Sequence, residues 1–194
     1  MQTTRLRFPC PLVDRLLALA CGIALGILVA ACTPAASHTT DLTGRVSVVD
    51  GDTLEIRGDR IRLWGVDAFE SRQLCDRPTG TYRCGQVAAN ALDTRLAGQV
   101  VTCEPVGRPD RYGRTVARCQ VRGQDLGAWL VESGHALDYP RYSQGRYARE
   151  QQRAQAARRG AWAGDFVPPW EWRARERKTR ALIGRIEAHD PNHI

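Results

Sequence analysis

Four acidic residues crowd one short stretch of the chain, and their spacing suggests that they meet at the open end of a β-hairpin. Two alternating runs flank Gly58-Asp59, which predicts a two-residue turn because glycine readily adopts positive φ. Pairing about this turn would place Asp52 opposite Gly65, and Asp50 opposite Asp67. Gathered carboxylates repel one another, and a hard cation with oxygen ligands relieves that repulsion. The crowded residues are Asp50, Asp52, Asp67 and Glu70.

An arginine on the same hairpin could bind a phosphate, but regular pairing points it the wrong way. In a flat hairpin Asp52 and Asp67 share one face, and Arg62 points to the opposite face. A site that uses all three side chains needs a bulge or strong twist between Arg62 and Asp67. Gly65 is the natural position for it, so the sequence predicts that the hairpin bends there.

Three motifs follow one another along this part of the chain. They are Val49-Asp50-Gly51-Asp52-Thr53, Arg62-Leu63-Trp64-Gly65-Val66-Asp67-Ala68-Phe69-Glu70 and Asp110-Arg111-Tyr112-Gly113-Arg114. In this order and spacing they are jointly specific and resemble the staphylococcal nuclease family, and the resemblance extends from about Arg45 to Trp162. It implies an OB-fold barrel and calcium-dependent hydrolysis of phosphodiester bonds in DNA and RNA, giving 3′-phosphate and 5′-hydroxyl ends.

The resemblance also implies roles for particular residues. The carboxylates of Asp52 and Asp67 and the backbone carbonyl of Ala68 would bind calcium, and Glu70 would be the general base. The residue before Glu70 is Phe69, where the best-known family member has proline. Phe69 lacks the rigidity of proline, so the motif alone leaves the placement of Glu70 open.

Two arginines would complete such a site. Arg62 and Arg114 would clamp the scissile phosphate, because a planar guanidinium pairs with phosphate oxygens through parallel hydrogen bonds. A phosphodiester is anionic and repels hydroxide, so hydrolysis needs positive charge aimed at the phosphoryl oxygens. Tyr112, Tyr139 and Tyr142 could stack on a base or sugar, or could equally pack beneath the neighbouring loops.

Each of these residues also has a purely structural interpretation. Asp50 and Asp52 could be turn residues, and Arg62 could simply pair with Glu55 across the hairpin. Arg114 could be a solvated turn residue. The corresponding alternative for the whole protein is a catalytically inactive OB-fold lipoprotein that binds nucleic acid.

The N-terminal residues resemble a bacterial export signal. Basic residues precede an apolar run, Leu16 to Ala31, which is shorter than the roughly 20 residues of a membrane span. The run ends before Cys32 in a pattern that resembles a lipobox, which implies cleavage and lipid attachment there. The protein would then be anchored on the periplasmic side of the envelope, with the outer membrane preferred because Thr33 follows. A cleaved signal with secretion, or an uncleaved anchor, is the alternative.

Export would leave four cysteines in an oxidising compartment. An even number there predicts two disulfides, with three possible pairings. We expect Cys75–Cys84, which closes a loop, and Cys103–Cys119, which would join two neighbouring strands. A zinc site is the alternative, although the spacings are not C-x-x-C and no histidine is near in sequence.

The chain is basic, with a formal net charge of +7, and Lys178 is its only lysine. This charge suits nucleic acid, anionic lipid or lipopolysaccharide, and does not choose among them. The four histidines are scattered along the chain, which gives no support to a histidine-based metal site or triad.

Short strands with interleaved helices predict an α+β fold, a five-stranded OB-fold barrel with about three helices, in a monomer. We expect a signal at 1–31, a tether at 32–41, a nuclease-like domain at 42–166 and, at 167–194, an aromatic wrap and a charged helical tail. Beyond the hairpin, strands are expected at 45–49, 100–106 and 115–121, and helices at 86–96, 125–134 and 147–159.

Overall fold

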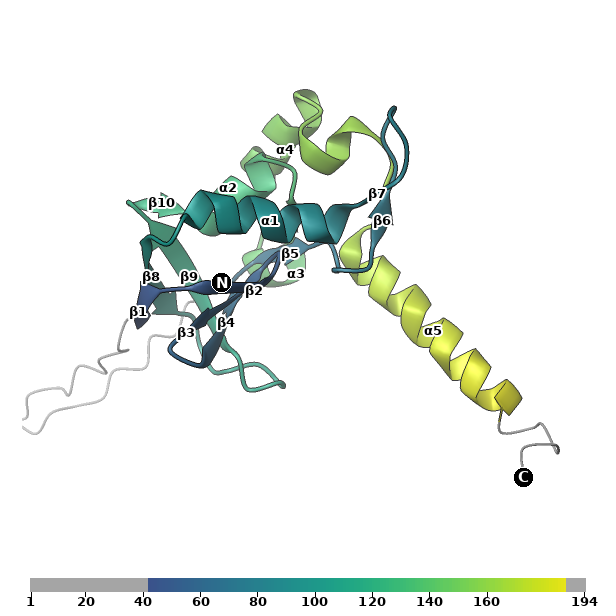
Figure 1. Cartoon of the computed structure of the whole chain (residues 1–194), viewed down its shortest axis with the longest axis horizontal. Helices are drawn as coiled ribbons and strands as arrows, with labels where there is room; N and C mark the ends of the chain where they lie inside the picture. The colour runs from purple at the N-terminus through teal and green to yellow at the C-terminus, as the bar shows by residue number, and fades with distance from the viewer. Residues whose placement is uncertain (1–41, 188–194) are drawn as a thin grey trace, which may run out of the picture. The chain divides into compact units, whose positions relative to one another are not determined.

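The computed structural model describes residues 42–187, which form a curled β-sheet with helices packed against it (Figure 1). The expected signal at 1–31, the tether at 32–41 and the lipidation residue Cys32 lie outside the described residues. Those expectations therefore stay predictions.

The main sheet curls into a half-barrel, as an OB-like fold requires. Six of its strands follow the order β1-β8-β9-β4-β3-β2, and β10 is added beside β9. Only Val46 separates β1 from β2, yet these two strands lie at opposite ends of that order, so the sheet must bend round on itself. The bounds are β1 (Leu42–Arg45), β2 (Ser47–Asp50), β3 (Thr53–Ile56), β4 (Asp59–Leu63), β8 (Val100–Pro105), β9 (Thr115–Val121) and β10 (Gln124–Asp125).

The predicted α+β architecture is confirmed, and β1 with β2 counts as one bent strand of a five-stranded barrel. The three expected helices correspond to α1, α2 and α4, and α1 lies beside β2 while α2 lies beside β9. Asp125 caps α2 as predicted, accepting a hydrogen bond from the Ala128 N–H at 3.1 Å. The helices are α1 (Cys84–Leu96), α2 (Leu126–Glu132), α3 (Pro140–Ser143), α4 (Ala148–Ala156) and α5 (Pro169–Glu187), with a 3₁₀ turn at Gly160–Ala163.

The central hairpin forms, but its turn lies one residue earlier than predicted. Ile56 pairs with Asp59, so the two loop residues are Arg57 and Gly58 and not Gly58-Asp59. Both have positive φ, 53° and 91°, as a two-residue primed turn requires. The prediction failed because it gave the positive φ to glycine alone, whereas an arginine adopts it here as well.

The earlier turn moves every predicted partner by two positions. Arg62 lies opposite Thr53, and Glu55 lies opposite Arg60. The Asp52 carbonyl accepts the Leu63 N–H at 2.9 Å, so Asp52 does not face Gly65 as predicted. A shift of two preserves the alternation of side chains between the faces, which is why the apolar face stays buried.

The predicted bend near Gly65 is confirmed. β4 ends at Leu63, and the chain turns at Trp64-Gly65, where Gly65 has a φ of 74°. After the turn, β5 (Val66–Ala68) leaves the main sheet and pairs with β11 (Ala136–Asp138). Asp67 therefore lies opposite Leu137, not opposite Asp50 as the flat hairpin predicted.

Both expected disulfides are present. Cys75 and Cys84 join the short strand β6 (Leu74–Cys75) to the start of α1, next to β7 (Tyr82–Arg83). Cys103 and Cys119 are directly paired residues of β8 and β9. The first disulfide belongs to a second, smaller core, which contains Phe69, Cys75, Cys84, Leu137 and Ala161 with Tyr82, Trp162, Phe166 and Trp170 against it.

Within residues 42–187, the longest helices are too short or too polar to cross a membrane.

Replacing Cys103 and Cys119 together with alanine should lower the free energy of unfolding by about 2–4 kcal/mol. The disulfide closes a loop with a sequence separation of 16, and opening it restores conformational freedom to the unfolded chain. Urea denaturation of both proteins under non-reducing conditions measures the loss.

The double variant at Cys75 and Cys84 is the matched control, because that bond closes a shorter loop, with a separation of 9, and its removal should cost less. An unchanged denaturation midpoint in the Cys103 and Cys119 variant would contradict the assigned pairing.

Candidate active site

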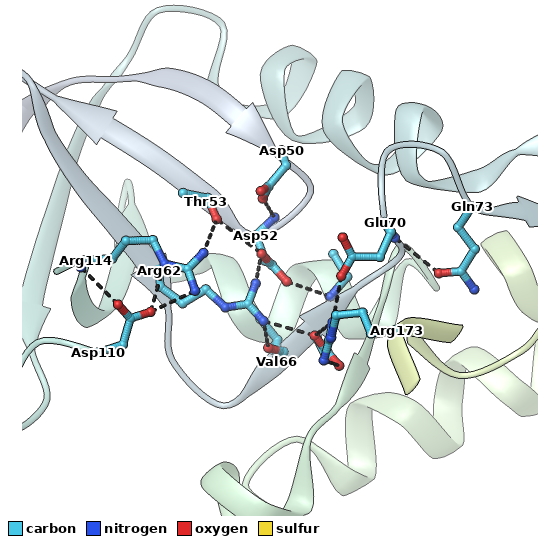
Figure 2. Close-up of polar contacts among 12 residues, drawn as sticks. Asp50, Asp52, Thr53, Arg62, Val66, Glu70, Gln73, Asp110, Arg114 and Arg173 are labelled. Atoms are coloured by element: carbon cyan, nitrogen blue, oxygen red, sulfur yellow. Dashed lines mark hydrogen bonds and ion pairs between the residues drawn. The ribbon is translucent and has the colours of Figure 1, made fainter. Parts of the chain in front are cut away.

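Two buried aspartates form the centre of the site, with an arginine between them (Figure 2). Asp67 is fully buried and Asp52 is 4% exposed. Arg62 donates from Nη2 to Asp67 Oδ1 at 3.0 Å and forms an ion pair from Nη1 with Asp52. The turn at Gly65 makes this possible, because it carries Asp67 back towards the side of the strand from which Arg62 projects.

The loop before β3 fixes Asp52 by its backbone and by its neighbours. Asp52 Oδ2 accepts the Ala68 N–H at 2.7 Å, which ties the loop to β5. Gly51 allows this approach, since a Cβ at that position would lie 2.8 Å from the Ala68 Cβ. Asp50 accepts the Asp52 N–H at 3.0 Å and is therefore the turn residue of the pair, whereas Asp52 points into the site.

Packing and one buried amide place Glu70, where the sequence left its position open. Phe69 is 2% exposed and meets Phe166 edge to face, with ring centroids 5.2 Å apart. The Glu70 N–H donates to Gln73 Oε1 at 3.2 Å, and the Gln73 amide donates in turn to the Val167 carbonyl at 2.6 Å. The aromatic contact and the Gln73 bridge thus anchor the backbone where the best-known relative has proline.

Arg114 is held beside Arg62 by a neighbouring carboxylate. Its Nε and Nη2 each lie 2.8 Å from Asp110 Oδ2, and its own N–H donates to Asp110 Oδ1 at 3.0 Å. Arg114 Nη1 also donates to Thr53 Oγ1 at 3.3 Å, and Thr53 is the strand partner of Arg62. The two arginines therefore meet on one face of the hairpin, and Arg114 is not a solvated turn residue.

The surroundings shift the pKa values of two of these groups. Partial burial acts against the charge on Asp110, but hydrogen bonds from Arg114 outweigh it and lower the pKa of that carboxyl. Burial lowers the pKa of Arg62, and the attraction of Asp67 and Asp50 opposes that effect. Arg62 keeps its charge nevertheless, since a guanidinium stays protonated in proteins.

Helix α5 supplies a third arginine that the sequence did not reveal. Arg173 Nη2 donates to Asp67 Oδ2 at 2.7 Å, and Nη1 donates to Asp67 Oδ1 at 2.9 Å and to Glu70 Oε1 at 2.8 Å. Burial disfavours its charge, yet the hydrogen bonds to Asp67 and Glu70 outweigh this and raise the pKa of Arg173.

Three residues that hold the site were thus missed from the sequence. Asp110 opens the third motif, so its position beside Arg114 was a usable signal. Gln73 lies in a polar loop without periodicity, and Arg173 is one of many arginines in a charged tail. Neither of these two carries a local pattern that points to the site.

The three candidate tyrosines divide into two groups. Tyr112 is exposed, and the guanidinium groups of Arg111 and Arg114 lie 4.7 Å and 5.4 Å from its ring centroid. Tyr139 donates its N–H to the Gly65 carbonyl, which places it beside the bend, and its ring meets Tyr142 edge to face. A role for them in stacking on substrate stays a prediction.

The side chains fit a hard cation in donor type but not in their present arrangement. Within residues 42–187, no three acidic, histidine or cysteine side chains are placed to hold a metal ion together. The oxygens of Asp52, Asp67 and Glu70 are instead bridged by the two guanidinium groups of Arg62 and Arg173. Carboxylates that need compensating charge are suitable ligands for calcium, provided that the guanidinium groups release them.

Comparisons with known proteins show which proteins this chain is similar to. A family profile described as staphylococcal nuclease homologue matches residues 60–164, which include Arg62, Asp67, Glu70 and Arg114. The chain is 34% identical over 144 residues to an uncharacterized endonuclease of Escherichia coli O157:H7, which covers 70% of this chain and 88% of that protein.

Two other relatives are longer than the shared region. The chain is 46% identical over 124 residues to the succinoglycan biosynthesis protein ExoI of Rhizobium meliloti (strain 1021), covering 62% of this chain and 64% of that protein. It is 31% identical over 137 residues to the probable staphylococcal-like nuclease CAN3 of Oryza sativa subsp. japonica, covering 70% of this chain and 33% of that protein. With a family profile across more than half of its length, and an endonuclease relative matched over most of its own, this chain belongs to the staphylococcal nuclease homologue family.

Proposed function

We propose that this protein is a calcium-dependent endonuclease that hydrolyses phosphodiester bonds of DNA and RNA. The observation that carries the proposal is that Arg62 and Arg114 lie close together on one face of the hairpin, next to the buried carboxylates. Family membership supports the reaction class, and the relatives named as endonuclease or nuclease support it further.

The two arginines bind and orient the phosphate. Each presents a planar set of N–H donors, and each is held by a carboxylate, Arg62 by Asp67 and Arg114 by Asp110. Donors fixed in this way need little reorganisation when negative charge builds up on the phosphoryl oxygens. Removing one such donor typically costs about 2.7–4 kcal/mol of transition-state stabilisation.

Glu70 takes the proton of the attacking water. The water oxygen bonds to phosphorus and the bond from phosphorus to the 5′ oxygen breaks. The 5′ oxygen takes up a proton from solvent water and ends as a hydroxyl, while the phosphate stays on the 3′ side. Asp52, Asp67 and the Ala68 carbonyl would hold the calcium ion, which supplies positive charge close to the phosphoryl oxygens.

One observation favours the second candidate, an inactive nucleic-acid-binding OB-fold protein. Arg173 bonds both oxygens of Asp67 and one of Glu70, so the site as described has neither a free metal ligand on Asp67 nor an unpaired base. Against this, a pure binder of polyanions gains nothing from buried carboxylates beside its phosphate-binding arginines. We therefore prefer the nuclease.

We also infer that the protein is exported and attached to the envelope by lipid on Cys32. The two disulfides support export, because such bonds persist in oxidising compartments and are rare in the cytosol. The lipobox resemblance supports the anchor.

Glu70→Gln and Arg114→Ala should each lower the rate of calcium-dependent cleavage of single-stranded DNA by about a hundredfold or more, from loss of the base or of a phosphate donor. Chelation of calcium should abolish cleavage by the wild-type protein. A gel assay with end-labelled DNA measures the rate and identifies the product ends.

Glu104→Gln is the matched control for this test, since Glu104 is an exposed residue of β8 and should leave the rate unchanged. A wild-type protein that retards DNA on a gel with calcium present, yet does not cleave it, would refute the nuclease and establish the binding protein.

Asp110→Asn should lower kcat by about tenfold or more with little change in KM, because it weakens the charged hydrogen bonds that orient Arg114. Asp59→Asn, in the exposed hairpin end, serves as the control. Steady-state kinetics, with the melting temperature measured in parallel, distinguish a positioning role of Asp110 from a purely structural one. A loss of stability without a change in kcat would argue against the positioning role.

Cys32→Ser should move the protein from the membrane fraction to the soluble fraction after cell lysis, because its lipid attachment would be lost. Immunoblots of the separated fractions measure the shift. Continued sedimentation of the variant with membranes would rule out lipid attachment at Cys32.

A further inference from the structure

The first turn of helix α5 closes the site with a positive charge. Asp67 Oδ1 accepts from both Arg62 and Arg173, and Asp67 Oδ2 accepts from Arg173 (Figure 2). Asp52 is similarly engaged, by Arg62 and by the Ala68 N–H. The Arg173 guanidinium spans both oxygens of Asp67, so a calcium ion bound through Asp67 would have to compete with Arg173 in its present position.

The same helix turn covers the aromatic group beside the site. Trp170, one turn before Arg173, stacks on Tyr139 with ring centroids 5.3 Å apart and an angle of 7° between the rings. A parallel ring at this distance occupies the face on which a nucleic-acid base would stack. Helix α5 therefore places a cation at the carboxylates and an aromatic ring on Tyr139, which is a predicted stacking residue.

The rest of α5 is weakly attached. From Ala174 to Ile186 its residues are exposed apart from the half-buried Glu176, and the helix extends away from the sheet (Figure 1). The contact between Arg72 and Glu176 is a surface ion pair at 4.0 Å, a type of contact worth little. The first turn, from Pro169 to Arg173, thus makes the main contacts that hold the helix on the site, and the later turns add little to them.

We propose that Arg173 is a built-in competitor of the divalent cation and that α5 is an autoinhibitory segment, which must leave the carboxylates before calcium can bind. Its regulatory meaning rests on the proposed nuclease function, but the competition itself is a property of binding. Arg173 supplies the positive charge that Asp67 and Glu70 need while calcium is absent. Once α5 has left the carboxylates, a bound calcium ion supplies that charge and keeps the helix turn away.

The competition can be measured without any substrate. If α5 is closed in nine of ten molecules, the apparent calcium affinity is reduced about tenfold, because only the open fraction binds. Arg173→Gln removes the competing charge and should therefore lower the calcium Kd of the full-length protein by up to about tenfold. Isothermal titration calorimetry with calcium chloride measures it.

Arg175→Gln is the matched control, because it removes the same charge from the same helix at an exposed position two residues away. A general effect of charge on calcium would tighten binding equally in both variants. Tighter calcium binding in Arg173→Gln alone supports the proposal. Calcium binding by Arg173→Gln that is no tighter than that of the wild-type protein, or no tighter than that of Arg175→Gln, overturns it.

A second measurement follows the helix itself. In the wild-type protein, saturating calcium should speed trypsin cleavage within residues 173–180 and change the fluorescence of the tryptophans on α5. Trp170→Ala loosens the helix without touching a carboxylate and should also lower the calcium Kd. Unchanged protection of α5 at saturating calcium would overturn the proposal.

The proposed nuclease activity can fail independently of the proposed competition between Arg173 and calcium. If Arg173→Gln binds calcium more tightly but neither it nor the wild-type protein cleaves DNA, the proposed function is refuted and the competition stands. Conversely, calcium-dependent cleavage by the wild-type protein, with an Arg173→Gln variant of unchanged Kd, would support the nuclease and overturn the role of α5.

Discussion

The structure depends on neutralising a carboxylate that lies entirely inside the protein. Asp67 has no access to water, and Asp52 beside it is almost as buried. An unpaired charge in such a place is strongly destabilising, so the fold must bring cations to it. The bend at Gly65 turns Asp67 towards Arg62, and the C-terminal helix brings Arg173 from 106 residues away. The features that could do chemistry are therefore the same features that make the burial of Asp67 tolerable.

The strands, the helix starts and the bend of the hairpin could be predicted, because residues close together in the sequence indicate them. The apolar alternation located the strands, Asp125 marked a helix start, and the conflict over the direction of Arg62 correctly required a bend at Gly65. The hairpin turn was misplaced because Arg57 adopts a positive φ, which is uncommon for a residue other than glycine. The supports of Glu70 could not be found in this way, since Gln73 reaches Val167 across 94 residues. Contacts of that range have no spacing rule in the sequence.

Phe69 shows how packing can anchor the backbone where this chain departs from the motif. Proline restricts the backbone directly, whereas Phe69 anchors it through a buried ring against Phe166. The Gln73 amide then bridges the Glu70 backbone to Val167. The placement of Glu70 consequently depends on residues that follow the part matched by the family profile, which ends at residue 164. In this chain the C-terminal segment belongs to the support of the site.

The dependence of the site on the C-terminal segment bears on how calcium binding could be controlled. Arg62 alone gives one positive charge to two buried aspartates, so the site needs a further cation in any state. Arg173 provides it from beyond residue 164, and it does so at the oxygens that a metal ion would use. If this charge can be exchanged for calcium, the protein never has to carry an uncompensated buried charge when the ion is absent. Stability without the metal and closure of the site would then be two consequences of a single contact, between Arg173 and Asp67.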